Sequence, residues 1–313
     1  MSDCDLIAAE VVRVPTGIGN CYIVGSSERW ILVDSGTHGH ANDIHAAVAE
    51  HIGEDARPEA IVLTHGHFDH SGCARELAED WEVGIYAHRM EFPFLNGKSA
   101  YPPPDPTVGG FMSQAIRFIP NKKMNVGDEN LHELSSGELP WLSGWEIFET
   151  PGHSPGHVSF FRREDGILIA GDAFTTVDQN SMTDTLAQRQ KVSSPPPYYT
   201  CDWQSAERSV KKLAELNPRV LAAGHGIPMR GAQATAQLRA LANNFPIPEH
   251  GRYVNKPAQT DENGIVYLPP APADPVKTIG MIAAGVIAGA VAMRFVFSRR
   301  NKEAERQSES RAA

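Results

Sequence analysis

The feature that most constrains this chain is a cluster of histidine and aspartate directly after a short apolar run. Residues 60–63 are Ala-Ile-Val-Leu, which is typical of a buried strand, and residues 64–70 are Thr-His-Gly-His-Phe-Asp-His. Neutral imidazole and carboxylate groups are ligands for zinc and similar transition metals. Burying such groups without a metal costs desolvation free energy and adds nothing to a core. The pattern therefore predicts a metal site at the end of a strand, with a histidine-rich surface turn as the alternative.

The same arrangement, an apolar strand followed by a potential metal ligand in a tight turn, recurs three times. The strands are expected at residues 145–150, 166–170 and 219–223. They are followed by His153, Asp172 and His225, respectively, each next to a glycine. Ligands at the ends of strands are typical of sites in α/β folds. We therefore expect these three side chains to meet the cluster at residues 65–70.

The H-x-H-x-D-H pattern of residues 65–70, followed in order by His153, Asp172 and His225, resembles the metal-binding sequence of the metallo-β-lactamase-fold hydrolases, the superfamily that includes glyoxalase II. The resemblance extends over residues 6–231. It implies an α/β protein built as a four-layer αββα sandwich.

The resemblance also implies a ligand set for two divalent ions. One ion would be held by His65, His67 and His153, the second by Asp69, His70 and His225, and Asp172 would bridge them. Zinc is the expected metal, with another divalent transition metal or iron as the alternative. In the family, an aspartate at the position of Asp34 supports the metal-binding loop through hydrogen bonds. The other role open to Asp34 is to cap the helix expected at residues 44–51.

A site of this kind implies a hydrolase. A metal-bound hydroxide held between the two ions would attack the carbonyl carbon of a small ester, thioester or lactone. Asp69 or Asp172 would carry a proton to the leaving group. Tyr198 and Tyr199, in a proline-rich loop, are candidates to donate a hydrogen bond to the substrate.

Two other functions stay open. The first is a persulfide dioxygenase on the same fold, with one iron held by His65 or His67, His153 and Asp172. The second is a non-catalytic, membrane-tethered binding module. A module without catalysis has no need to retain so many costly polar ligands, which favours an enzyme.

Composition narrows the partners and the compartment. The net charge of −10 disfavours nucleic acid, whose phosphates would be repelled, and leaves a small-molecule substrate. The four cysteines are scattered without C-x-x-C spacing, which suits a reducing compartment. The acidic N-terminus has no apolar run of signal-peptide length, so export by that route is not expected.

We expect residues 1–250 to form a metallo-β-lactamase-type catalytic domain. Within it, residues 91–140 depart from strand–helix alternation and are rich in proline and glycine, which predicts a cap inserted over the metals. Spaced prolines then predict an extended linker over residues 251–276.

The C-terminal sequence predicts a membrane anchor. Residues 277–297 are apolar enough for a transmembrane helix, and residues 298–313 form a basic tail. Gly285 and Gly289 have the spacing that allows close pairing of helices, so a helix-mediated dimer is a further expectation. The basic tail alone would place the domain outside the cell. Because no signal peptide precedes the domain, we expect a membrane-anchored protein with a cytoplasmic catalytic domain, and a soluble cytoplasmic protein as the alternative.

Overall fold

The structure is a computed structural model that describes residues 4–119, 121–274 and 276. The chain divides into two compact units, residues 1–271 and 272–313. The predicted transmembrane helix (277–297) and basic tail (298–313) lie outside the described residues. Among the helices that the structure describes, none is both long and apolar enough to cross a membrane.

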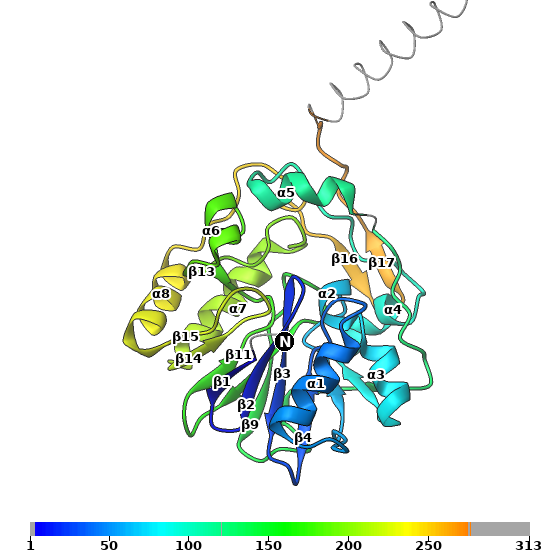
Figure 1. The fold of residues 1–313 in the computed structure, drawn as a ribbon. Coiled ribbons are helices and arrows are strands. Elements are labelled where there is room, and N and C mark those ends of the chain that lie inside the picture. Colours follow the sequence, from blue (N-terminus) through cyan, green and yellow to red (C-terminus); the bar gives the residue numbers. More distant parts are fainter. Residues whose placement is uncertain (1–3, 120, 275, 277–313) are drawn as a thin grey trace, which may run out of the picture. The chain divides into compact units, whose positions relative to one another are not determined.

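The first unit contains two β-sheets packed face to face (Figure 1). The first sheet has seven strands in sequence order: β1 (Asp5–Ala8), β2 (Val11–Thr16), β3 (Gly19–Gly25), β4 (Trp30–Val33), β5 (Ile61–Val62), β6 (Ile85–Ala87) and β7 (Leu131–Glu133). β1 to β4 are antiparallel neighbours, whereas β4 to β7 run parallel. Parallel neighbours need crossover connections. The β4–β5 crossover contains α1 (Ala41–His51), and the β5–β6 crossover contains α2 (Phe68–Ser71) and α3 (Ala74–Trp81).

The second sheet has six strands in the spatial order β15-β14-β11-β10-β9-β8. Their bounds are β8 (Gly137–Glu138), β9 (Trp145–Glu149), β10 (Val158–Arg162), β11 (Ile167–Ile169), β14 (Val220–Ala222) and β15 (Met229–Arg230). The crossover between the parallel strands β11 and β14 contains β12 (Thr175–Val177), α6 (Met182–Ala187), β13 (Gln190–Ser193) and α7 (Trp203–Glu215). β12 and β13 pair with each other, and α8 (Gly231–Asn243) follows β15.

Three buried apolar clusters hold the layers together. Between the sheets, Tyr22 of β3 and Phe160 of β10 belong to one cluster. On the outer face of the first sheet, α1 and α3 contribute Ile44 and Leu77 to a second cluster. On the outer face of the second sheet, α7 and α8 pack through a third cluster that includes Leu213. The order of layers is helix, sheet, sheet, helix, so the predicted αββα sandwich is confirmed.

The first strands depart from the sequence-based expectation. The Val- and Ile-rich residues 7–14 predict a single strand, but the chain forms the hairpin of β1 and β2. Glu10, between the two strands, adopts the left-handed conformation with φ of 59°. That conformation reverses the chain at Ala9 and Glu10, whose residue types favour strand less than the Val and Ile around them.

The predicted cap, residues 91–140, is only partly an insertion, because its last part belongs to the two main sheets. It begins with η1 (Arg89–Glu91) and α4 (Phe92–Leu95), followed by α5 (Phe111–Ala115) and η2 (Ile116–Phe118). β7 and β8, however, belong to the two main sheets, so the segment from Leu131 onward is part of the sandwich. Backbone hydrogen bonds from Asp105 to Tyr198 (2.7 Å) and from Phe111 to Asn180 (3.1 Å) join the cap to the loops opposite.

The expectation of an extended linker over residues 251–276 is wrong for its first part. β16 (Gln259–Asp261) and β17 (Gly264–Tyr267) form a hairpin there. Tyr253 is buried, and its hydroxyl donates to the carbonyl of Pro103 at 2.7 Å. The Asn263-Gly264 dipeptide favours a tight hairpin turn, and this signal outweighs the flanking prolines.

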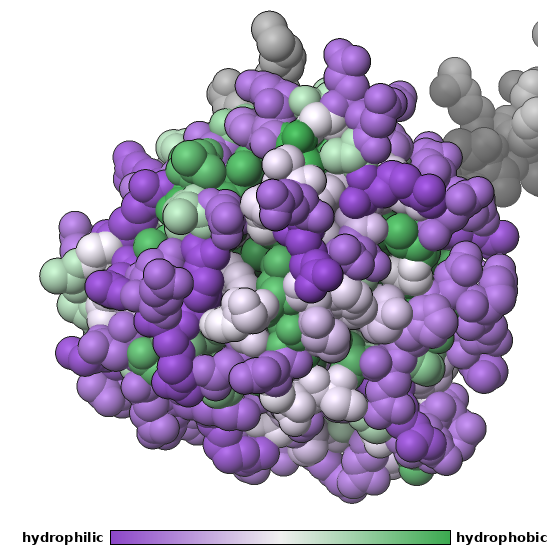
Figure 2. Space-filling view, turned by 90° about the horizontal axis from the view of Figure 1, so that it is seen from below, coloured by the Kyte–Doolittle hydropathy of each residue, from purple (hydrophilic) through white to green (hydrophobic). Residues whose placement is uncertain are grey.

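The end of the molecule that lies at the bottom of Figure 1 is mostly hydrophilic, with smaller hydrophobic areas between (Figure 2). A pocket of about 540 Å³ lies between the β3–β4 turn, at Gly25 and Arg29, and the segment around Trp141. None of the predicted metal ligands lines this pocket. The predicted ligands lie instead at the ends of strands.

Candidate metal centre

Three histidines converge at the end of β5. Nε2 of His65 lies 2.9 Å from Nδ1 of His67, which lies 3.0 Å from Nε2 of His153. His65 and His67 belong to the turn between β5 and α2, and His153 to the turn between β9 and β10. Nitrogen atoms this close must share a proton or a cation, because their lone pairs otherwise repel. The turn is tight, since a Cβ atom at Gly66 would lie 2.4 Å from the hydroxyl of Tyr101.

A second group of ligand atoms adjoins the first. Asp69 and His70 lie on α2, and His225 follows β14. Nε2 of His225 is 3.5 Å from Oδ2 of Asp69. Asp172, which follows β11, faces both groups: its Oδ2 lies 3.1 Å from Nε2 of His225 and 3.4 Å from Nε2 of His153. The side chains named by the sequence analysis as metal ligands thus all lie together.

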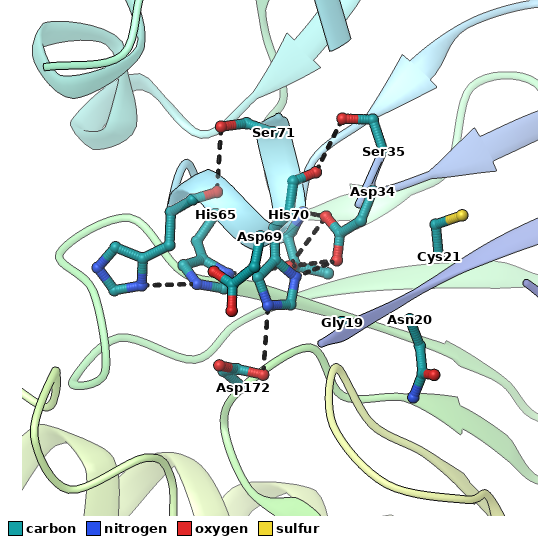
Figure 3. Close-up of polar contacts among 12 residues, drawn as sticks. Gly19, Asn20, Cys21, Asp34, Ser35, His65, Asp69, His70, Ser71 and Asp172 are labelled. Carbon is teal, nitrogen blue, oxygen red and sulfur yellow. Dashed lines mark hydrogen bonds and ion pairs between the residues drawn. The ribbon is translucent and has the colours of Figure 1, made fainter. Parts of the chain in front are cut away.

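The outer nitrogen atoms of two rings are fixed by acceptors. Nδ1 of His70 donates to Oδ2 of Asp34 at 2.8 Å, and Nδ1 of His225 donates to the carbonyl of Ile18 at 2.8 Å. Figure 3 shows the His70 ring between Asp34 and Asp172. With Nδ1 protonated in both rings, each Nε2 turns a lone pair toward the shared centre.

Asp34 holds the ligand turn as well as His70. It accepts hydrogen bonds from the backbone N–H of Thr64, at 2.7 Å, and from the hydroxyl of Thr64. It does not cap the helix that follows, because α1 begins at Ala41 with His40 at the capping position. Asp34 therefore orients the ring of His70, one of the predicted metal ligands.

The residues fit a divalent transition metal. Nε2 of His70 and Oδ1 of Asp172 are buried, have no hydrogen-bond partner among the described residues, and lie 3.5 Å apart. Buried polar atoms without partners cost free energy, and a cation between them would remove that cost. A set of imidazole nitrogen and carboxylate oxygen donors is the chemistry that zinc, iron and manganese accept.

Burial and neighbouring charges set the protonation of these groups. Burial lowers the pKa of His65 and His153 well below the usual value, and lowers that of His67 to about 3. These rings are therefore neutral at neutral pH, which is the form that binds metal. Burial would also lower the pKa of His70 and His225. In both rings, however, the nearby carboxylate of Asp172 outweighs burial, and the resulting pKa is raised.

The sequence is similar to a known protein superfamily and to known proteins. Residues 14–225 match the sequence profile of the Metallo-beta-lactamase superfamily. The chain belongs to this superfamily. It is 38% identical over 232 residues to "Probable metallo-hydrolase YflN" of Bacillus subtilis, a match that spans 73% of this chain and 88% of that protein.

Two further relatives are more distant. "Hydroxyacylglutathione hydrolase GloC" of Haemophilus influenzae is 29% identical over 167 residues, which are 52% of this chain and 70% of that protein. A metallo-β-lactamase superfamily structure from Sulfolobus tokodaii has a TM-score of 0.51 and 18% identity, and covers 75% of this chain and 85% of its own. The predicted family is confirmed, and the structural likeness shows the same fold.

Glu91 is the residue of this superfamily member that sequence reasoning missed. Its carboxylate is fully buried and accepts hydrogen bonds from the backbone N–H of Gly66 (3.0 Å) and of Gly156 (2.6 Å), and from the hydroxyls of Ser154 (2.9 Å) and Tyr101. Glu91 thereby ties the turn of His65 and His67 to the turn of His153. The only signal in the sequence is a carboxylate directly before the apolar residues 92–95.

The two candidate substrate tyrosines both lie beside the candidate metal ligands, but they make different contacts there. The ring of Tyr199 lies 4.5 Å from the ring of His67. Tyr198 is buried, donates to Oε1 of Gln179 at 3.1 Å, and lines a pocket that His225 also lines. Burial raises the pKa of both hydroxyls, so both stay protonated at neutral pH and can donate a hydrogen bond.

Proposed function

We propose that this protein is a metal-dependent hydrolase that cleaves an ester-type bond in a small ester, thioester or lactone. Membership of the superfamily supports the proposal, as do relatives described as metallo-hydrolases and as a hydroxyacylglutathione hydrolase. The observation that carries it is the convergence of two groups of three ligand atoms, each group within 4.8 Å, on Asp172.

We assign the ligands to two ions. One ion would be held by His65, His67 and His153, the other by Asp69, His70 and His225, with Asp172 shared between them. Zinc is the metal we expect, and iron is the alternative for the same donors. Two divalent ions in such a site supply an activated water and polarise the carbonyl of a substrate.

Residues of the chain would transfer the proton, bind the substrate and position the ligand turns. Asp69 is buried beside His225, and we propose that it receives a proton and passes it to the leaving group, a role that Asp172 could share. Tyr199, protonated at neutral pH, would hold the substrate by donating a hydrogen bond, and Tyr198 would do the same by exchanging its bond to Gln179 for one to the substrate. Asp34 and Glu91 would keep the ligand turns in place.

We also propose that residues 277–297 anchor this catalytic unit to a membrane, with the unit in the cytoplasm and with helix pairing as a route to a dimer. The support is the apolar sequence and the spacing of Gly285 and Gly289. Partition of the full-length protein between membrane and soluble fractions tests the anchor. Recovery of the protein in the soluble fraction alone would contradict it.

The proposed reaction is tested by a panel of substrates on zinc-loaded and iron-loaded protein. We expect hydrolysis of aryl esters, thioesters or lactones, and loss of that activity in His67→Ala. Oxygen consumption with a persulfide, and no hydrolysis, would instead favour the mononuclear iron dioxygenase. Metal binding with neither activity would favour a non-catalytic binding module.

A further inference from the structure

A pocket of about 340 Å³ opens beside His225. One wall is the β2–β3 hairpin, which contributes Ile18 and Gly19. The remaining lining includes Met112 of α5, Tyr198, and a segment around β12 and α6 that contributes Val177, Gln179, Thr185 and Gln188. The pocket adjoins the metal-binding groups, because a Cβ at Gly19 would lie 2.6 Å from the carbonyl oxygen of Asp69. A substrate whose carbonyl lies at the metal-binding groups would place its next atoms here.

The pocket offers little to a charged ligand. Among its lining residues that the structure describes, Arg13 is the only lysine or arginine. The guanidinium of Arg13 is already engaged: its Nε donates to Asn20 at 2.8 Å, and its Nη1 pairs with Asp5 at 2.9 Å. The side chain of Arg13 is only 12% exposed. A carboxylate or phosphate on the substrate would therefore find no free cation among the described lining residues.

Part of the pocket lining is apolar and consists of Pro15, Ile18, Met112 and Val177. Large hydrophobic side chains are exposed on the segments that form it: Ile18, Phe111, Met182, Leu186 and Ile227. Ile18 lines the pocket directly, and Phe111, Leu186 and Ile227 each directly adjoin a lining residue in the sequence. The cap is joined to the loop before α6 here, because the backbone N–H of Phe111 donates to the carbonyl of Asn180. The polar lining side chains are already engaged, since Gln179 accepts from Tyr198 and Gln188 donates to the carbonyl of Thr185. An apolar lining with its polar neighbours satisfied favours an apolar ligand.

We infer that this pocket binds the unbranched hydrocarbon chain of an uncharged acyl ester or acyl thioester. The inference rests on the proposed hydrolase function and names its substrate class. The acyl carbonyl would lie at the candidate metal-binding groups, and the chain would run past Ile18 and Met112 toward Val177. Each methylene buried is worth about a fourfold gain in affinity.

The first test is a homologous series of p-nitrophenyl esters and of matching thioesters, from acetyl to decanoyl, with the zinc-loaded full-length protein. We expect kcat/KM to rise about fourfold per methylene until the pocket is full. Met112→Gln should flatten this dependence on chain length. Val266→Gln, which changes an exposed apolar residue of β17 outside the pocket, is the matched control and should leave the dependence unchanged. The two series show whether the natural leaving group is an alcohol or a thiol.

A second test does not depend on hydrolysis. Calorimetric titration with 1-octanol and 1-butanol, which carry no carbonyl, should show octanol binding on the order of a hundredfold more tightly. Met112→Gln should weaken the binding of octanol, and Val266→Gln should not.

The outcomes separate the two proposals. Hydrolysis that is equal for acetyl and decanoyl esters, with no binding of octanol, overturns the acyl-chain pocket and leaves the hydrolase. Binding of octanol without hydrolysis of any ester or thioester overturns the hydrolase and keeps a pocket for a hydrocarbon chain. Failure of both measurements overturns both.

Discussion

The backbone N–H of Asp172 donates a hydrogen bond to Nε2 of His157, at 2.9 Å. Nδ1 of the same ring must then be the protonated nitrogen, and it donates to the hydroxyl of Thr150 at 2.8 Å. The series continues from Thr150 to Ser159 and ends at the carbonyl of Ala170. Burial lowers the pKa of His157 to about 3, so this ring stays neutral. His157 therefore positions the backbone of Asp172 and is not itself one of the metal ligands we assign.

We predict that His157→Ala lowers the free energy of unfolding by about 3 kcal/mol, because it leaves a cavity and two buried groups without partners. It should also weaken metal binding, since Asp172 loses the group that positions it. Denaturant titration and a competitive metal titration measure the two effects. His51→Ala, at an exposed histidine in the last turn of α1, is the control. Equal stability of the two variants would contradict the role given to His157.

Asp34→Asn should separate the fold from the metal site. Asp34 has φ of 60°, a conformation that asparagine also tolerates, so the backbone should be preserved. The amide cannot accept from both Thr64 and Nδ1 of His70 as the carboxylate does. We expect roughly a 10-fold to 100-fold loss of affinity for one metal ion with an unchanged circular dichroism spectrum. Asp43→Asn, at an exposed partner of His40, should bind both ions as the unmodified protein does.

Glu91→Ala should damage the fold and the site together. Its carboxylate is the shared acceptor of two ligand turns, so we expect a loss of about 3 kcal/mol or more in the free energy of unfolding. Glu91→Gln keeps one acceptor oxygen and should lie between Glu91→Ala and the unmodified protein. Glu79→Ala removes an exposed carboxylate on α3 and serves as the control. Full metal affinity in Glu91→Ala would show that the two turns do not need this tie.

Removal of metal by a chelator should lower the melting temperature. A ligand present at 100 times its dissociation constant stabilises a folded protein by about 2.7 kcal/mol, which corresponds to roughly 5–10 °C for a domain of this size. Differential scanning calorimetry with zinc and with excess chelator measures the difference. The same melting temperature in both conditions would mean that the folded protein does not bind zinc at this site.

The ligand-bearing turns could be predicted from the sequence because each is encoded locally. An apolar run forms the strand, a glycine permits the turn, and a histidine or aspartate stands at its end, as at His65 and Asp172. Glu91 could not be predicted in this way. The groups that it joins, at Gly66, Ser154 and Gly156, lie 25, 63 and 65 residues away in the chain.

The errors in the fold have a similar origin. The prolines at 257 and 269 favoured an extended linker over the hairpin of β16 and β17, although Asn263-Gly264 is a strong turn signal. β7 and β8 are too short and too polar to be recognised as strands by pattern, and only their neighbours in the two sheets define them. The residue types of these segments do not favour strands. Their strand structure comes from pairing with neighbouring strands in the folded protein.

The most direct test of the proposed binuclear centre is the number of metal ions per chain. Elemental analysis of the full-length protein, after incubation with zinc and removal of excess metal, should give two ions per chain for the unmodified protein, and fewer for His67→Ala with the fold intact. One ion per chain in the unmodified protein, or two ions retained by His67→Ala, would contradict the assignment of two ions to this site.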